Sequence, residues 1–479
     1  MAMLFNIFTL LSGSVAFAAA NQTPIPICCN ALESIAELRG KVYLPRSDAY
    51  TDRMGTYFSK SAALKPWCMV LPSTAEDVSL IVKALVANDC PFGVRSGGHS
   101  SHPLSNSVEK GVTIDFGHMN ATAWKPDTDL VSIQPGSRWQ DVYDVLTPHG
   151  ITVAGAVSAP GGGISFFAAS HGWACDNIAN YEVVLANGSI VYANAQDNPD
   201  LWQALKGGSA NLGLVTRFDM LPIELVGPSE GTIWGGNLVF GSESGDDLIN
   251  ALVDFSDNVY KDENSSASVS FSYQPKLVGG MVGLVSIENT LALSKPQAFD
   301  GFYGIGAALN DTTRVDTMSA LSRELSEGQP MGFRNMFITA SFKNDPRPMK
   351  YALNKVNKLN AELEEITQTL KANFTTVYTV QPVTKSIVEK SIAKGAMLWV
   401  ERLAMPKAES LVRDVEAYAE ELGLGREWKY LNYAHGSQDA IATVGEDALD
   451  KLQAASAKYD PNRVFQRLRT SGFKIPQDK

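Results

Sequence analysis

The chain has 479 residues, with 40 Lys and Arg against 51 Asp and Glu, and a formal net charge of -11 at pH 7. Its length exceeds one ordinary hydrophobic core, so we expect two large domains or one domain interrupted by another. The negative charge and the lack of Lys and Arg clusters disfavour nucleic acid and anionic membranes as partners, because both bind basic patches.

The N-terminus predicts a secretory signal. Met3 to Phe17 is almost wholly apolar and is followed by Ala18, Ala19 and Ala20. The apolar stretch is too short for a spanning helix, and the small residues suit cleavage after Ala18 or Ala20. We therefore expect residues 1–20 to be removed and the mature protein to be secreted, soluble and not bound to a membrane.

The cysteines and the glycosylation acceptors agree with this location. Five cysteines allow one or two disulfides in a secreted protein. We predict that Cys28 or Cys29 pairs with Cys68, and that Cys90 and Cys175 are buried thiols because they lie in apolar segments. Six Asn-x-Ser/Thr acceptors indicate surface glycosylation, at Asn21, Asn120, Asn187, Asn264, Asn310 and Asn373.

From Met69 to Ile223, short β-rich runs alternate with helical stretches. The apolar spacing predicts a helix over Ala75 to Asn88, capped by Ser73, and a second helix over Trp139 to Leu146. Asn187-Gly188 predicts a hairpin turn between residues 183–186 and 190–192. The other predicted strands are Gly93 to Arg95, Val112 to Phe116 and Leu130 to Gln134.

After residue 223 the pattern changes to longer strands and helices. The predicted strands are 231–240, 268–273 and 281–287, and the predicted helices are 349–369, 408–422 and 446–458. This set predicts an antiparallel sheet with one face covered by helices. The fold class we predict is α+β, with a two-part domain of mixed sheets (21–223, core 64–223), an inserted domain (224–424) and a returning C-terminal segment (425–479).

A glycine-rich hexapeptide directly follows one predicted strand. It reads Arg95-Ser96-Gly97-Gly98-His99-Ser100. Adjacent glycines let backbone N–H groups approach a phosphate without obstruction by Cβ atoms. Arg95 and the two serines would add donors, and His99 would hold a nucleophilic nitrogen beside the ligand. Taken alone, the hexapeptide is equally compatible with a tight turn that carries an ordinary loop histidine.

Several segments in the same order resemble a known family. They are Pro91 to Ser100, Gly111 to Asp115, Gly172 to Asn177, Asp200 to Gly208 and Asn211 to Thr216. Together they resemble the FAD-binding domain of the vanillyl-alcohol oxidase superfamily, and more narrowly the berberine bridge enzyme-like oxidases of fungi. The resemblance implies FAD as cofactor, bonded through its 8α-methyl group to His99, with the glycine loop around the pyrophosphate.

The C-terminal part extends this resemblance. Tyr430-Leu431-Asn432-Tyr433, followed by Lys458 to Phe465, is similar to the segment that folds back onto the flavin in this family. The resemblance implies Tyr430 as the proton acceptor and Asn432 as a residue that holds the flavin or the local backbone. Since Tyr430 and Tyr433 are three apart, they cannot share one face of a regular strand, and we expect at least one to be a packing residue. The other implied cofactor-binding residues are Gly161, Gly162, Gly163 and Val215.

One stretch departs from the family pattern. Between Ser158 and the triple glycine the chain has only Ala159-Pro160, where family members have a longer glycine-rich stretch that lines the pyrophosphate and the flavin edge. No cysteine lies between Cys90 and Cys175, so we expect no second bond to the flavin. The short loop keeps open the alternative of an inactive, flavin-free secreted binding protein.

The implied reaction transfers a hydride from a small alcohol, amine or secondary metabolite to FAD, which dioxygen then reoxidises with release of hydrogen peroxide. The alternative enzyme is an oxidase of carbohydrates or oligosaccharides. Glu401 is a further candidate, although a salt-bridged surface carboxylate is the favoured interpretation. We expect no metal, because the spacing of the other histidines does not suit metal ligands; they are His102, His118, His149, His171 and His435.

Overall fold

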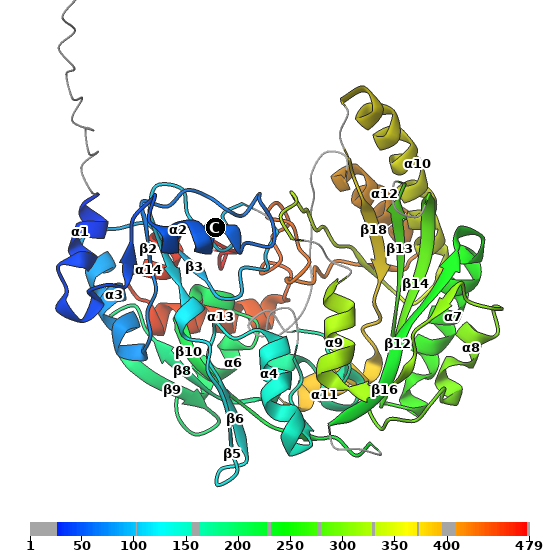
Figure 1. Ribbon diagram of the computed structural model, residues 1–479, viewed down its shortest axis with the longest axis horizontal. Coiled ribbons are helices and arrows are strands. Elements are labelled where there is room, and N and C mark those ends of the chain that lie inside the picture. Colours follow the sequence, from blue (N-terminus) through cyan, green and yellow to red (C-terminus); the bar gives the residue numbers. More distant parts are fainter. Residues whose placement is uncertain are drawn as a thin grey trace, which may run out of the picture.

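The computed structural model describes residues 26–101, 103–155, 163–227, 231–275, 279–327, 331–370, 373–394 and 408–476. Two lobes lie side by side (Figure 1). The first lobe comprises the described residues up to 227 and those from 428 to 476. The second lobe comprises the described residues from 231 to 427. The chain therefore leaves the first lobe and later returns to it.

The first lobe contains a four-stranded mixed sheet in the order β1-β2-β4-β3. Strands β2 and β3 run parallel to β4, and β1 is antiparallel to β2. The helix expected over 75–88 is α3 (Ala75–Ala87). Its cap is Thr74 and not Ser73, because Thr74 forms a capping box with Asp77. The other elements are β1 (Val42–Tyr43), α2 (Asp48–Gly55), β2 (Cys68–Val70), β3 (Phe92–Arg95) and β4 (Val112–Asp115).

Two disulfides attach α1 (Ile27–Glu33) to this sheet and its helix. Cys29 is bonded to Cys68, which is one of the two predicted alternatives, and Cys28 is bonded to Cys90. The prediction that Cys90 is a free thiol is therefore wrong. Its apolar neighbours correctly indicate burial, but only the docking of α1 brings the Cys28 sulfur to it. Cys175 is a buried free thiol, as predicted.

A five-stranded antiparallel sheet in the order β5-β6-β10-β8-β9 forms the other part of the first lobe. The predicted hairpin joins β8 to β9, and Gly188 has the positive φ of 80° typical of such turns. The elements are β5 (Thr122–Lys125), β6 (Leu130–Ile133), α4 (Trp139–Leu146), β7 (Ile151–Thr152), α5 (Ala168–His171), β8 (Ile178–Val184), β9 (Ile190–Asn194), α6 (Pro199–Leu205), β10 (Leu214–Met220) and β11 (Ile223–Glu224).

The C-terminal segment packs into the first lobe through α13 (Glu446–Tyr459) and α14 (Val464–Arg467). Leu452 of α13 belongs to the same buried core as Leu201 of α6. The backbone also continues the mixed sheet, since the Phe92 N–H donates to the Leu468 carbonyl at 2.9 Å. The residues after 428 thus complete both the core and one sheet edge of this lobe.

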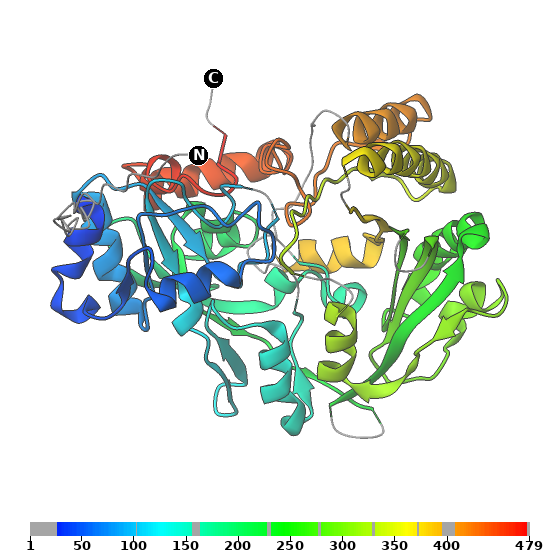
Figure 2. The same cartoon turned by 45° about the horizontal axis from the view of Figure 1, so that its top comes forward.

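One antiparallel sheet forms the second lobe, in the order β15-β12-β14-β13-β18, with β16 also paired to β12. An apolar core joins one face of this sheet to α7 and α10, which confirms the predicted helix-covered sheet. Figure 2 shows α12 (orange) beside α10 (olive), where the Tyr351 and Tyr418 rings stack with centroids 4.4 Å apart. The strands are β12 (Thr232–Gly241), β13 (Ser265–Gln274), β14 (Gly280–Asn289), β15 (Asn310–Asp311), β16 (Arg314–Thr317) and β18 (Thr376–Val380).

The helices of the second lobe lie on different sides of this sheet. In Figure 1, α7 and α8 cover the side away from the first lobe, and α9 lies between the sheet and the first lobe. Among the described residues, no helix is both long and apolar enough to cross a membrane. The remaining elements are α7 (Gly245–Asn258), α8 (Asp300–Tyr303), α9 (Met318–Glu327), β17 (Ser341–Phe342), α10 (Pro346–Leu370), α11 (Lys385–Ala393), α12 (Ala408–Glu421) and β19 (Gly425–Arg426).

Candidate active site

The predicted phosphate-binding hexapeptide forms the loop that leaves β3. Gly98 has a φ of +72°, and a Cβ there would lie 2.7 Å from Arg95 Nε, so this position requires glycine. A Cβ on Gly97 would meet no described atom within 4 Å. The Gly98 carbonyl accepts the Phe58 N–H at 3.1 Å, which holds the turn. The backbone at Gly97 is therefore open to a ligand, while Gly98 packs against the Arg95 side chain, which supports the loop.

Arg95 is that support. Its side chain is fully buried, and its guanidinium donates to the Arg53 carbonyl at 2.7 Å and to Thr56 Oγ1 at 2.6 Å. It also pairs with the buried Asp115 carboxylate at 3.1 Å and lies 3.9 Å from the centre of the Tyr57 ring. Burial lowers the pKa of Arg95, and the charge of Asp115 opposes this effect. These contacts show that Arg95 holds the loop in place, and its direct donation to the cofactor stays a prediction.

His99 follows the two glycines and is half-buried. Its imidazole stacks on the Phe58 ring, with centroids 4.2 Å apart and planes inclined by 12°. Nδ1 is buried and has no hydrogen-bond partner among the described residues. Burial and then the charge of Arg138 lower the pKa of His99 below its ordinary value, which favours the neutral ring at pH 7. A neutral imidazole with an unused nitrogen fits the expected attachment point for a flavin.

Tyr430 lies in a turn and not in a regular strand. The prediction that at least one of the two tyrosines is a packing residue is confirmed, because Tyr430 belongs to the buried core of the first lobe and Tyr433 packs against it. The Tyr433 N–H donates to the Tyr430 carbonyl at 2.9 Å, and this turn brings the two rings within 4.8 Å of each other. Tyr430 Oη accepts hydrogen bonds from the Ile164 N–H and from Asn432 Nδ2, both at 2.9 Å. Burial raises the pKa of Tyr430 well above its ordinary value, although these two donors act in the opposite direction.

Ring contacts join the two motifs across a long sequence separation. Phe58 contacts both His99 and Phe337, the latter with centroids 6.2 Å apart. Phe337 contacts Tyr433 at 6.1 Å, and Tyr433 contacts Tyr430 at 4.8 Å. We call these five side chains the aromatic row. The predicted flavin ligand and the predicted proton acceptor therefore belong to one continuous group of rings.

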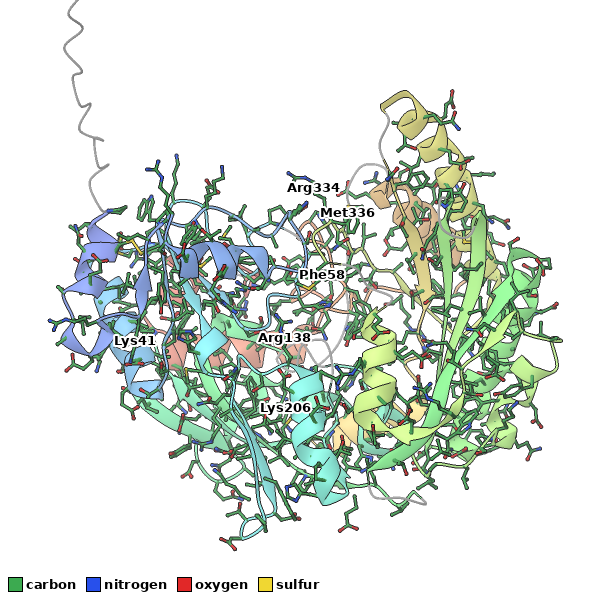
Figure 3. All side chains as sticks on the ribbon, in the orientation of Figure 1. Lys41, Phe58, Arg138, Lys206, Arg334 and Met336 are labelled. Carbon is green, nitrogen blue, oxygen red and sulfur yellow. A yellow bond between two sulfur atoms is a disulfide. The ribbon has the colours of Figure 1, made fainter. Side chains whose placement is uncertain are left out.

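Sequence reasoning misses Phe58, Phe337 and Arg138. Figure 3 shows Phe58 and Arg138 in the region between the two lobes. Phe337 lies on the crossover from α9 to α10, which is held to the first lobe because Gly332 N–H donates to the Phe58 carbonyl at 3.2 Å. No local pattern marks these residues, since each acts through a neighbour that is distant in sequence.

The contacts of the other predicted cofactor residues say little about whether they bind a ligand. Gly163 has a φ of +91°, and its carbonyl accepts the Ala174 N–H at 2.8 Å. Val215 is half-buried in β10, opposite Val183 of β8. Ser96 is exposed and Ser100 is half-buried. The predictions for Gly161, Gly162, the short loop after Ser158 and Glu401 concern residues outside the described ranges.

The histidines other than His99 make ordinary contacts. His149 lies 4.9 Å from the Trp124 ring, and His171 Nδ1 is 2.8 Å from Ser170 Oγ. His118 is exposed, His435 Nδ1 is 3.0 Å from Ser437 Oγ, and His102 lies outside the described residues. In the part of the chain that the structure describes, no group of three or more His, Cys, Asp or Glu side chains could hold a metal ion.

The structure thus places an open glycine backbone beside an imidazole whose Nδ1 has no partner among the described residues. A family model described as FAD binding domain matches residues 66–194, which include the glycine loop and His99. The chain is 32% identical to the FAD-dependent monooxygenase drtC of Aspergillus calidoustus, over 94% of this chain and 90% of that protein. FAD is therefore the cofactor, and the substrate is a small molecule.

Solved structures share the fold of both lobes. A variant of berberine bridge enzyme in complex with (S)-reticuline has a TM-score of 0.67 and 14% identity, covering 94% of this chain and 98% of that chain. A xylooligosaccharide oxidase from Myceliophthora thermophila C1 in complex with xylobiose has a TM-score of 0.69 and 17% identity, covering 91% and 97%. The protein belongs to the same family of FAD-dependent oxidoreductases as the Aspergillus relative, and it shares the fold of berberine bridge enzyme.

Proposed function

We propose that this enzyme is a secreted oxidase of a small alcohol, amine or secondary metabolite, with FAD bonded covalently to His99. The observation that carries the proposal is the half-buried His99, whose ring stacks on Phe58 and whose Nδ1 has no partner among the described residues. A buried polar atom without a partner is costly, so a native structure normally has a reason for it. A bond to the flavin at this ring is such a reason.

Bound FAD supplies the hydride acceptor and the reaction with dioxygen that gives hydrogen peroxide. The protein has to hold the ring, orient the substrate and accept one proton. We propose Tyr430 as the proton acceptor, because the Ile164 N–H and the Asn432 amide both donate to its oxygen and so favour the phenolate. Burial raises the pKa of Tyr430. We therefore expect turnover to rise with pH, as the phenolate fraction grows.

Three observations support secretion. The two disulfides require an oxidising compartment in most organisms. Four of the glycosylation acceptors are exposed, namely Asn120, Asn187, Asn310 and Asn373. Asn264 is half-buried and accepts a hydrogen bond from Thr290. The N-terminal apolar stretch, which lies outside the described residues together with Asn21, suits a signal peptide.

A second candidate is a monooxygenase, because the Aspergillus relative is a FAD-dependent monooxygenase. A monooxygenase places one oxygen atom in the product and returns the other as water, whereas an oxidase returns both as peroxide. Turnover under ¹⁸O₂ separates the two. Labelled product without peroxide supports the monooxygenase, and one peroxide per product without label supports the oxidase.

The attachment is tested by mass spectrometry of the peptide that contains His99, using protein secreted from a eukaryotic host. We expect a yellow protein whose His99 peptide carries the mass of FAD. His99→Ala should lose the covalent mass and keep its fold, while His118→Ala, at an exposed histidine outside the site, should keep both. A colourless wild-type protein with an unmodified His99 peptide would overturn the proposal and favour a flavin-free binding protein.

The proton acceptor is tested by Tyr430→Phe with a matched control. We expect kcat to fall about 10²–10⁴-fold while flavin content stays the same. Tyr181→Phe is the control, because Tyr181 is fully buried in the same core and its hydroxyl has no partner among the described residues. It should turn over at the wild-type rate. If Tyr430→Phe does the same, Tyr430 is not the proton acceptor.

A further inference from the structure

The sheet of the second lobe has two chemically different faces. Alternate residues of a strand point to opposite faces. On β13, Ala267, Val269 and Phe271 lie in the apolar core shared with α7 and α10. The opposite face of the same strand carries four serines, Ser266, Ser268, Ser270 and Ser272.

Hydroxyls also lie on the two neighbouring strands, and on β14 they share the face with Leu284, which is opposite Ser270. Ser268 is opposite Ser286 of β14, and Ser270 is opposite Thr379 of β18. The hydroxyl oxygens of Ser270 and Thr379 are 2.8 Å apart and share a hydrogen bond. We call Ser268, Ser270, Ser286 and Thr379 the hydroxyl row. Thr379 is exposed and the three serines are half-buried, so all four are accessible.

This face is turned toward the first lobe. Asn237 of β12 is opposite Ser286 and therefore shares its face, and the Asn237 amide donates to Glu324 of α9 at 2.9 Å. Helix α9 is joined to α4 of the first lobe by a hydrogen bond between Gln140 and Ser319. Figure 1 shows the same arrangement, with α9 between the sheet and the first lobe. The hydroxyl row thus faces the lobe that carries the glycine loop.

The face differs from an ordinary solvated strand surface. At one end it closes around Glu288, which is 4% exposed and accepts hydrogen bonds from Ser266 at 2.7 Å and Ser286 at 2.8 Å. Toward the other end it opens, and Val377 is 59% exposed. Glu288 is the one charged residue on this face of β13 and β14, both of which are described in full. The accessible polar groups of this face are therefore small and neutral, and they suit a neutral polar ligand better than an ion.

We propose that the hydroxyl row is the substrate-selecting wall of the active site, and that it selects neutral substrates carrying several hydroxyl or carbonyl oxygens. Ser286 donates to Glu288, and one proton is shared between Ser270 and Thr379, so Ser268 and one member of that pair can donate to a ligand. All four oxygens can accept, so the row can match either type of oxygen. Paired strands hold the groups rigidly, about 5 Å apart across the sheet and about 7 Å apart along a strand. A substrate without such oxygens would desolvate these hydroxyls and leave them unpaired.

This inference rests on the proposed function, because it takes the region between the lobes as the place of reaction. It is tested with the flavin-loaded protein and two variants, Ser268→Ala/Ser270→Ala and Thr379→Val. Ser256→Ala is the matched control, since Ser256 is a half-buried serine on α7, behind the sheet. The probes are 3,4-dihydroxybenzyl alcohol and cellobiose, which are rich in oxygen, and benzyl alcohol, which has one hydroxyl.

The readouts are flavin content, the rate of flavin reduction without dioxygen, and separate values of KM and kcat. We expect the wild type and Ser256→Ala to prefer an oxygen-rich probe. The double variant should raise KM for that probe about 10–100-fold with kcat changed less than about threefold, and Thr379→Val should raise it about 3–10-fold.

Three outcomes overturn the inference while the proposed function stands. They are an unchanged preference in both variants, an equal loss in Ser256→Ala, and a yellow wild type that reacts with benzyl alcohol but with neither oxygen-rich probe. A yellow wild type reduced by none of the probes also overturns it, because the row then fails to select oxygen-rich compounds. A colourless wild type overturns the proposed function itself.

Discussion

The glycine loop of the first lobe and the hydroxyl row of the second lobe are built in opposite ways. Beneath the loop, the buried Arg95 is bonded on several sides, and Gly98 has no room for a Cβ. On the sheet, Ser268 and Thr379 lie on strands whose backbones are already paired, and their side chains are accessible. Cofactor binding is therefore tied to the stability of the first lobe, whereas side chains on this face of the second lobe can be substituted with little effect on folding.

The largest effect should come from breaking the support under the loop. Arg95→Ala leaves the buried Asp115 carboxylate with Arg53 as its remaining ion-pair partner and the Gly117 N–H as a hydrogen-bond donor. We expect a loss of about 3–5 kcal/mol in the free energy of unfolding together with loss of flavin. Urea denaturation and the visible spectrum measure both.

Arg347→Ala is the control, because its ion pair with Asp345 involves an arginine side chain that is 54% exposed, and it should leave the free energy of unfolding nearly unchanged. If Arg95→Ala fails to fold, Asp115→Asn gives the milder test. Equal costs for the buried and the exposed pair would contradict the comparison.

The disulfides are the second way to separate the lobes. Removing the Cys28–Cys90 bond, whose partners are 62 residues apart, should destabilise the protein by about 3–4 kcal/mol. Both disulfides lie in the first lobe, so hydrogen exchange in the Cys28→Ser/Cys90→Ser variant should accelerate in α1 and α3 and remain slow in β13 and β14. A uniform acceleration would show that the two lobes unfold as one unit.

Gly98→Ala tests the packing of the glycine loop against Arg95 by adding a single Cβ atom. We expect a cost of about 2–3 kcal/mol, because the added Cβ meets Arg95 and the backbone has a φ of +72°. Gly279→Ala is matched to it, with a φ of +75° and no described atom within 4 Å, and should cost about 1 kcal/mol. Equal costs would mean that the backbone angle alone, and not the contact with Arg95, demands glycine in the loop.

The last effect depends on pH and concerns Glu288, the buried carboxyl at the closed end of the sheet face. Burial raises the pKa of Glu288 to about 7, above the value of about 4.3 in an unfolded chain. Between these values the folded protein binds the extra proton, so this group stabilises the fold at low pH and loses that contribution as pH rises through about 7.

Denaturation at several pH values should therefore show about 3–4 kcal/mol less decline between pH 4 and pH 8 in Glu288→Gln than in the wild type. Glu389→Gln, at a glutamate that is 60% exposed, should leave the profile unchanged. A wild-type profile without this decline would mean that Glu288 is ionised throughout.

Local patterns in the sequence identified much of the fold and part of the site. The helix over Trp139 to Leu146, the hairpin at Asn187-Gly188 and the helix-covered sheet depend on spacing and turn chemistry that neighbouring residues specify. The glycine loop is likewise local, since Gly98 has a conformation that few other residues adopt. Because such local motifs can be read from the sequence, the resemblance that they carry correctly predicted FAD as the cofactor.

Most helices and strands, the glycine loop and the family could be predicted from the sequence, because each depends on residues close together along the chain. Three facts became visible only in the folded molecule. Cys90 pairs with Cys28, Phe58 and Phe337 connect His99 to Tyr430, and the serines of β13 face the first lobe. Those facts depend on how distant segments dock. Docking is set by the burial of whole faces, and no short stretch of sequence records which face meets which.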